Sequence, residues 1–154
     1  MSALSLQEQY AAKSICFGCG PANAQGLQLR SFADGDSVIA TFVPAPHHHA
    51  FPGVLNGGII GALLDCHSNW AACWHLMVAG GLGAPPCTVT ADFHVRLKRP
   101  TPMAEVRLVA KVASHEADRA LVEAALEGSN GKICATCTGT FVAVKEDHPA
   151  YHRW

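Results

Sequence analysis

The stretch FPGVLNGGIIGALLDCHSNWAACW, residues 51–74, decides the fold of this chain. It is almost wholly apolar or glycine up to Leu64, and a carboxylate follows at Asp65. The paired glycines at 57–58 predict the start of a long helix, and those at 80–81 predict its end. Because an ionised carboxylate without a partner is costly to bury, Asp65 inside this apolar helix requires a reason.

The segments on both sides of the helix alternate between apolar and polar residues, as half-buried strands do. Before the helix, 27–33 and 37–43 flank the turn sequence Asp34-Gly35 and predict a hairpin. After it, four further strands are predicted at 87–99, 104–114, 119–128 and 132–144. Two strands, one long apolar helix and four strands joined by short turns predict an α+β domain whose antiparallel sheet covers the helix.

The composition restricts the partners that this chain is expected to have. A 49% hydrophobic share beside 15% charged residues in 154 residues predicts one domain that shares surface with another chain, so an oligomer is expected. A formal net charge of -1 leaves no overall basic field, so neither nucleic acid nor a membrane is expected as a partner. The N-terminal residues show no secretory signal, which predicts a cytoplasmic location.

The cysteines raise the question of a metal site. Seven is an odd number, which favours reduced thiols over a disulfide framework. Of the two C-x-x-C pairs, Cys134 and Cys137 lie on an alternating strand, where positions three apart face opposite sides of the sheet. The other pair, Cys16 and Cys19, has a turn-like spacing, and the consecutive histidines at 47–49 suit a loop. We therefore expect no metal site.

One face of the predicted helix carries an unusual set of residues. Gly58, Gly61, Asp65 and Asn69 are spaced by three or four positions, which places one acid and one amide on a stripe of small residues. An acid in this setting predicts a catalytic group. Two structural explanations stay open: tight packing of the glycines on the sheet, and an acid satisfied by the helix dipole or by Asn69.

With its elements in this order, the chain resembles the hotdog-fold acyl-CoA thioesterases of the phenylacetic-acid-pathway, or PaaI-like, type. Three segments carry the resemblance: CFGCGPANAQGLQLR, FPGVLNGGIIGALLD and TADFHVRLKRPTP. It covers nearly the whole chain and implies a single hotdog domain over residues 1–154, with an N-terminal extension at 1–26 and a tail at 145–154. It also implies a homodimer or homotetramer with active sites at the subunit interface.

The resemblance implies that the chain hydrolyses an acyl-CoA with no cofactor apart from the coenzyme A of the substrate. Asp65 then acts as general base towards water or as nucleophile, and both roles fit the sequence. The N–H groups of Gly57 and Gly58 lie at the positive end of the helix and can stabilise an oxyanion, and the resemblance indicates Gly57. Asn56 stands where the family usually has a histidine that shapes the pocket floor, and an asparagine can still donate and accept hydrogen bonds.

Further residues are expected to bind the substrate: Gly58, Thr90, His48, Asn69, Arg96 and Arg99. By the resemblance, Thr90 lines the pocket near the acid. His48 lies shortly before the paired glycines at 57–58, where it can cap the pocket. Arg96 and Arg99 belong to a short basic stretch that can bind the phosphates of coenzyme A.

Two other functions fit the same fold. One is a non-catalytic hotdog protein that binds an acyl-CoA or an acyl chain, and the presence of Asn56 in place of histidine supports it. The other is a dehydratase, which needs a catalytic histidine paired with an acid. His67 is close to Asp65 in the sequence, but helix neighbours so placed do not face each other, so His67 is expected to be an interior residue.

Overall fold

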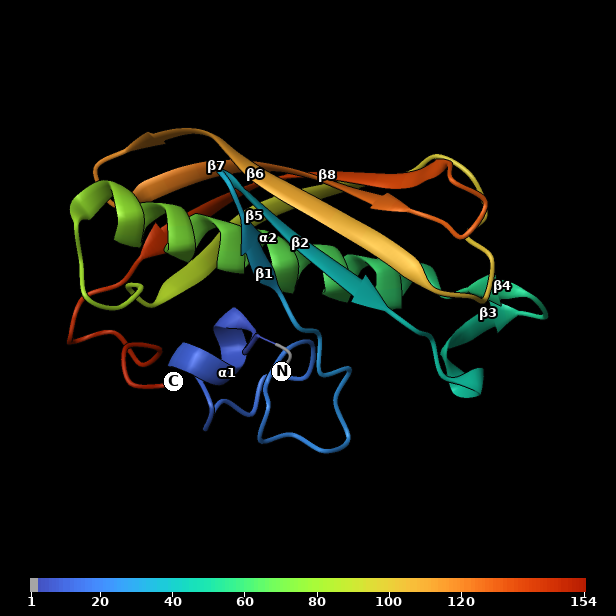
Figure 1. Ribbon diagram of the computed structural model, residues 1–154, viewed down its shortest axis with the longest axis horizontal. Helices are drawn as coiled ribbons and strands as arrows, with labels where there is room; N and C mark the ends of the chain where they lie inside the picture. Colours follow the sequence, from blue (N-terminus) through green and yellow to red (C-terminus); the bar gives the residue numbers. More distant parts are fainter. Residues whose placement is uncertain (1–2) are drawn as a thin grey trace.

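A computed structural model describes residues 3–154 (Figure 1). Six antiparallel strands form one sheet in the order β1-β2-β6-β7-β8-β5, and the long helix α2 lies along one face of it. The sheet comprises β1 (Phe32–Asp34), β2 (Ser37–Phe42), β5 (Thr88–Leu97), β6 (Val106–Glu116), β7 (Arg119–Glu127) and β8 (Ile133–Ala143). The helix α2 spans Gly57–Gly80. The predicted α+β arrangement, an antiparallel sheet covering one long helix, is confirmed.

Both ends of α2 lie where the sequence predicts them. At the start, Asn56 is the N-cap, and its Oδ1 accepts a hydrogen bond of 3.1 Å from the N–H of Ile59. At the end, Gly81 has a φ of 61°, a left-handed conformation that glycine adopts without steric cost. The N–H of Leu82 then donates to the carbonyl of Met77 and satisfies one of the last helical acceptors.

The hydrophobic core lies between α2 and the sheet. Along β7, every second side chain is buried, as the alternating pattern of that segment predicts. The helix supplies the large apolar side chains that face these strands. The most deeply buried of the core side chains are Leu63, Leu64, Trp70, Leu108, Val122, Leu126 and Phe141.

The first predicted strand begins later than expected. The sequence pattern predicts a strand over 27–33, but β1 begins only at Phe32. Upstream of it, the N–H groups of Leu27 and Leu29 donate to the carbonyls of Phe17 and Gly18, at 2.7 and 3.0 Å. The chain pairs here with the turn that contains the first C-x-x-C pair, so it joins the sheet only at Phe32.

Three short elements were not predicted. A helix of one turn, α1 (Leu6–Tyr10), lies near the N-terminus, and a 3-10 turn covers Pro46–His48. A small hairpin, β3 (His49–Phe51) with β4 (Val54–Leu55), follows that turn and leads into α2. The loop predicted around the three histidines is thus partly ordered as a turn and a strand.

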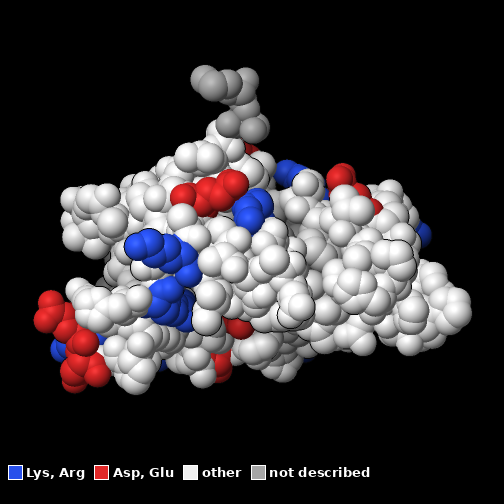
Figure 2. All heavy atoms as spheres, turned by 90° about the horizontal axis from the view of Figure 1, so that it is seen from below, with Lys and Arg blue, Asp and Glu red and all other residues white. Residues whose placement is uncertain are grey.

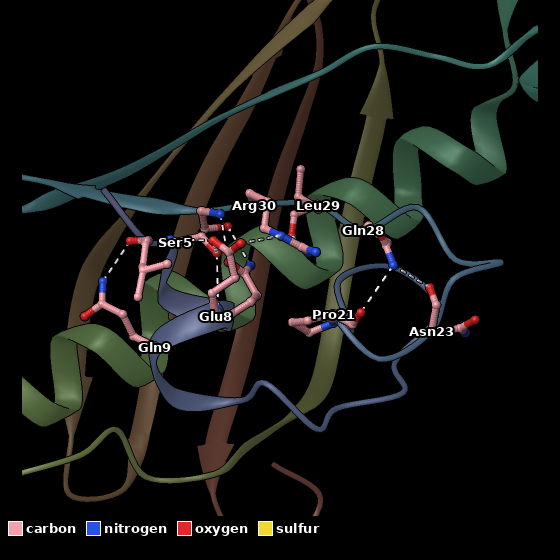
Figure 3. Close-up of polar contacts among 11 residues, drawn as sticks. Ser5, Glu8, Gln9, Pro21, Asn23, Gln28, Leu29 and Arg30 are labelled. Atoms are coloured by element: carbon pink, nitrogen blue, oxygen red, sulfur yellow. Dashed lines mark hydrogen bonds and ion pairs between the residues drawn. The ribbon is translucent and has the colours of Figure 1, made fainter. Parts of the chain in front are cut away.

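Local polar contacts hold together the N-terminal segment, residues 3–31 (Figure 3). Ser5 and Glu8 form a capping box at the start of α1, and Glu8 also faces Arg30 at 3.8 Å. The side-chain amide of Gln28 donates to the carbonyls of Pro21 and Asn23, at 3.3 and 2.9 Å. This segment, together with the C-terminal residues, lies on the side of α2 away from the sheet (Figure 1).

His67 joins the N-terminal segment to the core. Its ring is fully buried, with Nδ1 at 2.8 Å from the Ser31 hydroxyl and Nε2 at 2.8 Å from the Val38 carbonyl. Because a carbonyl only accepts, Nε2 carries the proton and Nδ1 accepts from Ser31. Burial lowers the pKa of His67 to about 4, against a smaller opposing effect of the Val38 carbonyl. His67 is the interior residue that the sequence predicts.

The surface below α2 is largely uncharged. Figure 2 shows this face, on which basic and acidic side chains occupy small separate groups among uncharged residues. Among residues 3–154, α2 is the longest helix, and none of the helices has the length and apolar character needed to cross a bilayer.

Candidate functional site

The carboxylate of Asp65 lies between α2 and the edge strand β5. It is half-buried, and its Oδ1 accepts a hydrogen bond of 2.7 Å from the hydroxyl of Thr90. Burial raises the pKa of Asp65, while the bond from Thr90 opposes that rise. Within residues 3–154, Oδ2 has no hydrogen-bond partner and the carboxylate takes part in no ion pair. One oxygen is therefore oriented by Thr90, and the other is available to a water or a substrate.

Neither Asn69 nor the helix dipole satisfies the carboxylate of Asp65. Asn69 does not serve Asp65, because its side-chain amide bonds the hydroxyl of Thr88 at 2.7 Å. Asp65 lies beyond the first turn of α2, where the effect of the helix dipole fades. The two pairs, Thr90 with Asp65 and Thr88 with Asn69, instead bind one face of the helix to β5.

A small cavity of about 70 Å³ adjoins Asp65. It is bordered by the N-terminal segment, by α2, by β5 and by the C-terminal residues. The ring of Trp154 closes one side by stacking on Trp70, with centroids 4.7 Å apart. The residues lining it are Ser14, Cys16, Cys19, Asp65, Cys66, Asn69, Trp70, Thr90, Arg153 and Trp154.

A second, larger cavity of about 440 Å³ lies at the start of α2. Gly57 lines it from the helix, and Leu97, Lys98 and Arg99 line it from the end of β5 and the turn that follows. The N–H groups of Gly57 and Gly58 precede the first helical hydrogen bond, and no acceptor for them lies within the described residues. The cavity therefore combines an apolar wall, Gly57 with its unpaired N–H, and basic side chains.

Asn56 and His48 support this helix start from outside the cavity wall. Asn56 uses its side-chain oxygen as the helix cap, and its backbone N–H donates to the carbonyl of His48 at 2.9 Å. The His48 ring stacks on Phe42, and its Nδ1 accepts from the N–H of Ala45 at 3.0 Å. Neither side chain lines the larger cavity. Arg96 also lies outside that lining, exposed on β5.

Gly57 and Asp65 are too far apart to act on one atom within a single chain. Eight residues of helix separate them, a rise of about 12 Å at 1.5 Å per residue. Between them, Gly58 is exposed, and a methyl group added to Gly61 would meet no atom within 4 Å. This part of the predicted stripe is therefore not packed against the chain's own sheet.

Three thiols lie together beside Asp65, and the sequence did not indicate this cluster. The sulfurs of Cys16, Cys19 and Cys66 lie within 4.8 Å of one another. Hydrogen bonds from the thiols of Cys19 and Cys66 hold the pKa of Cys16 well below its usual range, and the same contacts with Cys16 raise the pKa values of the other two. Cys66 is far from the C-x-x-C pair in sequence, so only the fold brings the three together.

Solved structures of other proteins share this fold. A thioesterase-superfamily protein from Shewanella loihica PV-4 is 33% identical, with a TM-score of 0.63 over 81% of this chain and 98% of that chain. A thioesterase from Haemophilus influenzae is 17% identical, with a TM-score of 0.73 over 96% and 97% of the two chains. The PaaI protein of the Escherichia coli phenylacetic acid degradation operon is 15% identical, with a TM-score of 0.66 over 80% and 85%. No protein-family model and no curated protein matches the chain.

Proposed function

This chain belongs to the thioesterase superfamily and has its hotdog fold, and we propose that it hydrolyses an acyl-CoA or a related acyl thioester to a free acid and a thiol. The observation that supports this most is the state of Asp65. Its carboxylate is oriented by Thr90 through one oxygen, and the other oxygen has no partner among residues 3–154. An acid held in this way can accept a proton from water.

In the proposed reaction, Asp65 acts as general base. It takes a proton from a water molecule, whose oxygen attacks the thioester carbonyl carbon. The N–H of Gly57 stabilises the resulting oxyanion, and one such donor contributes about 3 to 4 kcal/mol to the transition state. The carbon–sulfur bond then breaks, and the thiolate recovers the proton from Asp65. Direct attack by the carboxylate, through a mixed anhydride, is the alternative within the same site.

The proposed site requires two copies of the chain. Because about 12 Å of helix separates Gly57 from Asp65, the oxyanion donor and the base that meet one thioester come from different chains. The strand β5 forms one edge of the sheet and exposes Phe93 and Leu97. An edge with exposed apolar side chains is a natural surface for pairing with a second copy. We therefore propose a homodimer, or a tetramer built from such dimers.

The basic residues beside the larger cavity fit the phosphates of coenzyme A. Lys98 and Arg99 line that cavity, and Arg96 is exposed on the adjoining strand. Guanidinium groups bind phosphates through charge-assisted hydrogen bonds. In this arrangement, the acyl group enters between the two helices while the nucleotide stays at the surface.

The experiment that tests this function is turnover of a panel of acyl-CoA thioesters with a thiol-detecting reagent. We expect release of free coenzyme A and acid in equal amounts for at least one acyl group. Tight binding of an acyl-CoA without turnover of any member would identify a carrier or sensor instead. A dehydratase is not proposed, because no histidine lines the described cavity that adjoins Asp65.

A further inference from the structure

The spacing of the three clustered thiols suits a metal ion. The sulfurs of Cys16 and Cys66 lie 3.7 Å apart, and all three sulfurs lie within 4.8 Å of one another. Four ligands placed tetrahedrally at a zinc–sulfur distance of about 2.3 Å have sulfurs about 3.8 Å apart. A disulfide would need a separation of about 2.05 Å. The Cys16–Cys66 spacing already suits a zinc ion. Sulfur pairs that are farther apart reach the same spacing with small side-chain movements.

The backbone around the C-x-x-C pair is built to present both sulfurs to α2. The N–H of Gly20 donates to the carbonyl of Cys16 at 2.8 Å and closes the turn. A side chain at Gly18 would overlap the sulfur of Cys66, and one at Gly20 would overlap the backbone of Cys16 and Ser14. Gly18 is therefore needed for the close approach of the turn to the third thiol, and Gly20 is needed for the turn itself to close.

The segment 27–29 also fixes the turn, through backbone hydrogen bonds. The N–H groups of Leu27 and Leu29 donate to the carbonyls of Phe17 and Gly18, between the two cysteines. The turn is therefore fixed on both sides before any ion binds. Preorganised ligands lose little conformational entropy on binding.

Three of the four other cysteines behave differently, which argues against simple packing of the three clustered thiols as small apolar groups. Cys73, Cys87 and Cys134 each donate to a backbone carbonyl close by, those of Trp70, Ala150 and Lys132 respectively. Cys16, Cys19 and Cys66 instead face one another. Cys16 is also exposed, which gives an ion a path from solvent.

We propose that Cys16, Cys19 and Cys66 bind one Zn²⁺ ion, with a water in the adjoining cavity as the fourth ligand. Thiolates select zinc among the common divalent ions of the cell, and the cavity of about 70 Å³ has room for a water. The ion joins the N-terminal turn to α2 beside Asp65. This site was not expected from the sequence, because its third ligand comes from the helix. It does not depend on the proposed hydrolysis.

The first test uses the full-length protein as purified. Elemental analysis is expected to find about one zinc per chain, or to show that one is taken up when zinc is added under reducing conditions. X-ray absorption at the zinc edge is expected to show three sulfur neighbours at about 2.3 Å and one oxygen or nitrogen neighbour. A protein that takes up no zinc, or zinc with only oxygen and nitrogen neighbours, overturns the proposal. So does a Cys16–Cys66 disulfide recovered in place of the metal.

The second test identifies the ligands. Cys16→Ser and Cys66→Ser are each expected to weaken zinc binding by more than about 10-fold, the lower end of what even an outer-shell change costs. Cys134→Ser is the control, because Cys134 belongs to the other C-x-x-C pair and a serine can donate to the same carbonyl. Unchanged zinc affinity in both ligand variants contradicts the proposal. If those variants do not fold, the absorption spectrum of the unmodified protein decides.

Discussion

Thr90 on the edge strand β5 donates a hydrogen bond of 2.7 Å to Asp65 on the central helix. This contact orients the carboxylate and, with the neighbouring Thr88–Asn69 pair, fixes the rotation of α2 against the edge of the sheet. The opposite end of the same strand supplies Leu97 to the cavity at Gly57. The edge strand is therefore the element on which both parts of the proposed site depend.

Asp65→Asn is expected to lower the turnover of the best acyl-CoA by at least about 100-fold, the usual scale for a lost general base. The fold should be retained, because the amide is nearly isosteric, and the melting temperature should stay equal or rise once a half-buried acid is removed. Melting temperature and hydrolysis are measured on the same preparation. A variant that is less stable but has normal specific activity would show that Asp65 is structural.

Thr90→Val should reduce kcat about 10-fold or more, because a hydrogen bond to a charged group contributes about 1.5 to 3 kcal/mol. Thr90→Ser keeps the hydroxyl and serves as the matched control, with kcat expected close to that of the unmodified protein. Steady-state kinetics on both variants measure the effect. Equal activity of the valine and serine variants would mean that the hydroxyl does not orient the carboxylate during turnover.

Asn56→Ala removes the side-chain cap of α2 and should lower the free energy of unfolding by about 1 kcal/mol. Asn56→Ser restores a capping oxygen, so its stability should lie near that of the unmodified protein. Chemical denaturation of the three proteins gives the comparison. A stable alanine variant would indicate that the cap contributes little at this end of the helix.

The assembly follows from the open edge and the separation of Gly57 from Asp65. Light scattering at micromolar concentration is expected to give the mass of a dimer or tetramer. Phe93→Glu, which places a charge on the exposed edge strand, should shift the protein to monomers and remove turnover together. Leu4→Glu, at another exposed apolar position, should change neither. A fully active monomer would contradict the two-chain site.

The stability of the protein should fall in mild acid because of His67. Its pKa is about 4 in the fold, against about 6.5 for a free histidine, so the unfolded chain binds the proton first as the pH falls. The contribution is complete above pH 6.5 and is lost progressively towards pH 4, by up to about 3 kcal/mol. His67→Gln offers an N–H donor and an oxygen acceptor to the same two partners and does not titrate. Its unfolding free energy should vary less over this range, and an equal slope in the two proteins would exclude His67 as the cause.

The sequence by itself determined the central helix and most of the sheet. The glycines at 57–58 and 80–81 mark the start and the end of the helix. The caps formed by Asn56 and Gly81 involve only residues within a few positions of each helix end. The Asp34-Gly35 turn and the alternation of 104–114 and 119–128 likewise depend on neighbouring residues alone. Helix periodicity also predicts that His67 does not face Asp65, because the angle between two side chains on a helix depends only on how many positions separate them.

Only the tertiary structure decided which distant residues meet. The first strand begins at Phe32 because residues 27–29 pair with the turn around Gly18, a contact between loops that no periodic pattern encodes. The same turn brings Cys16 and Cys19 to Cys66, and the packing of β5 on the helix brings Thr90 to Asp65. Local preferences act over a few residues, whereas these contacts exist only when the helix, the edge strand and the N-terminal segment have packed together.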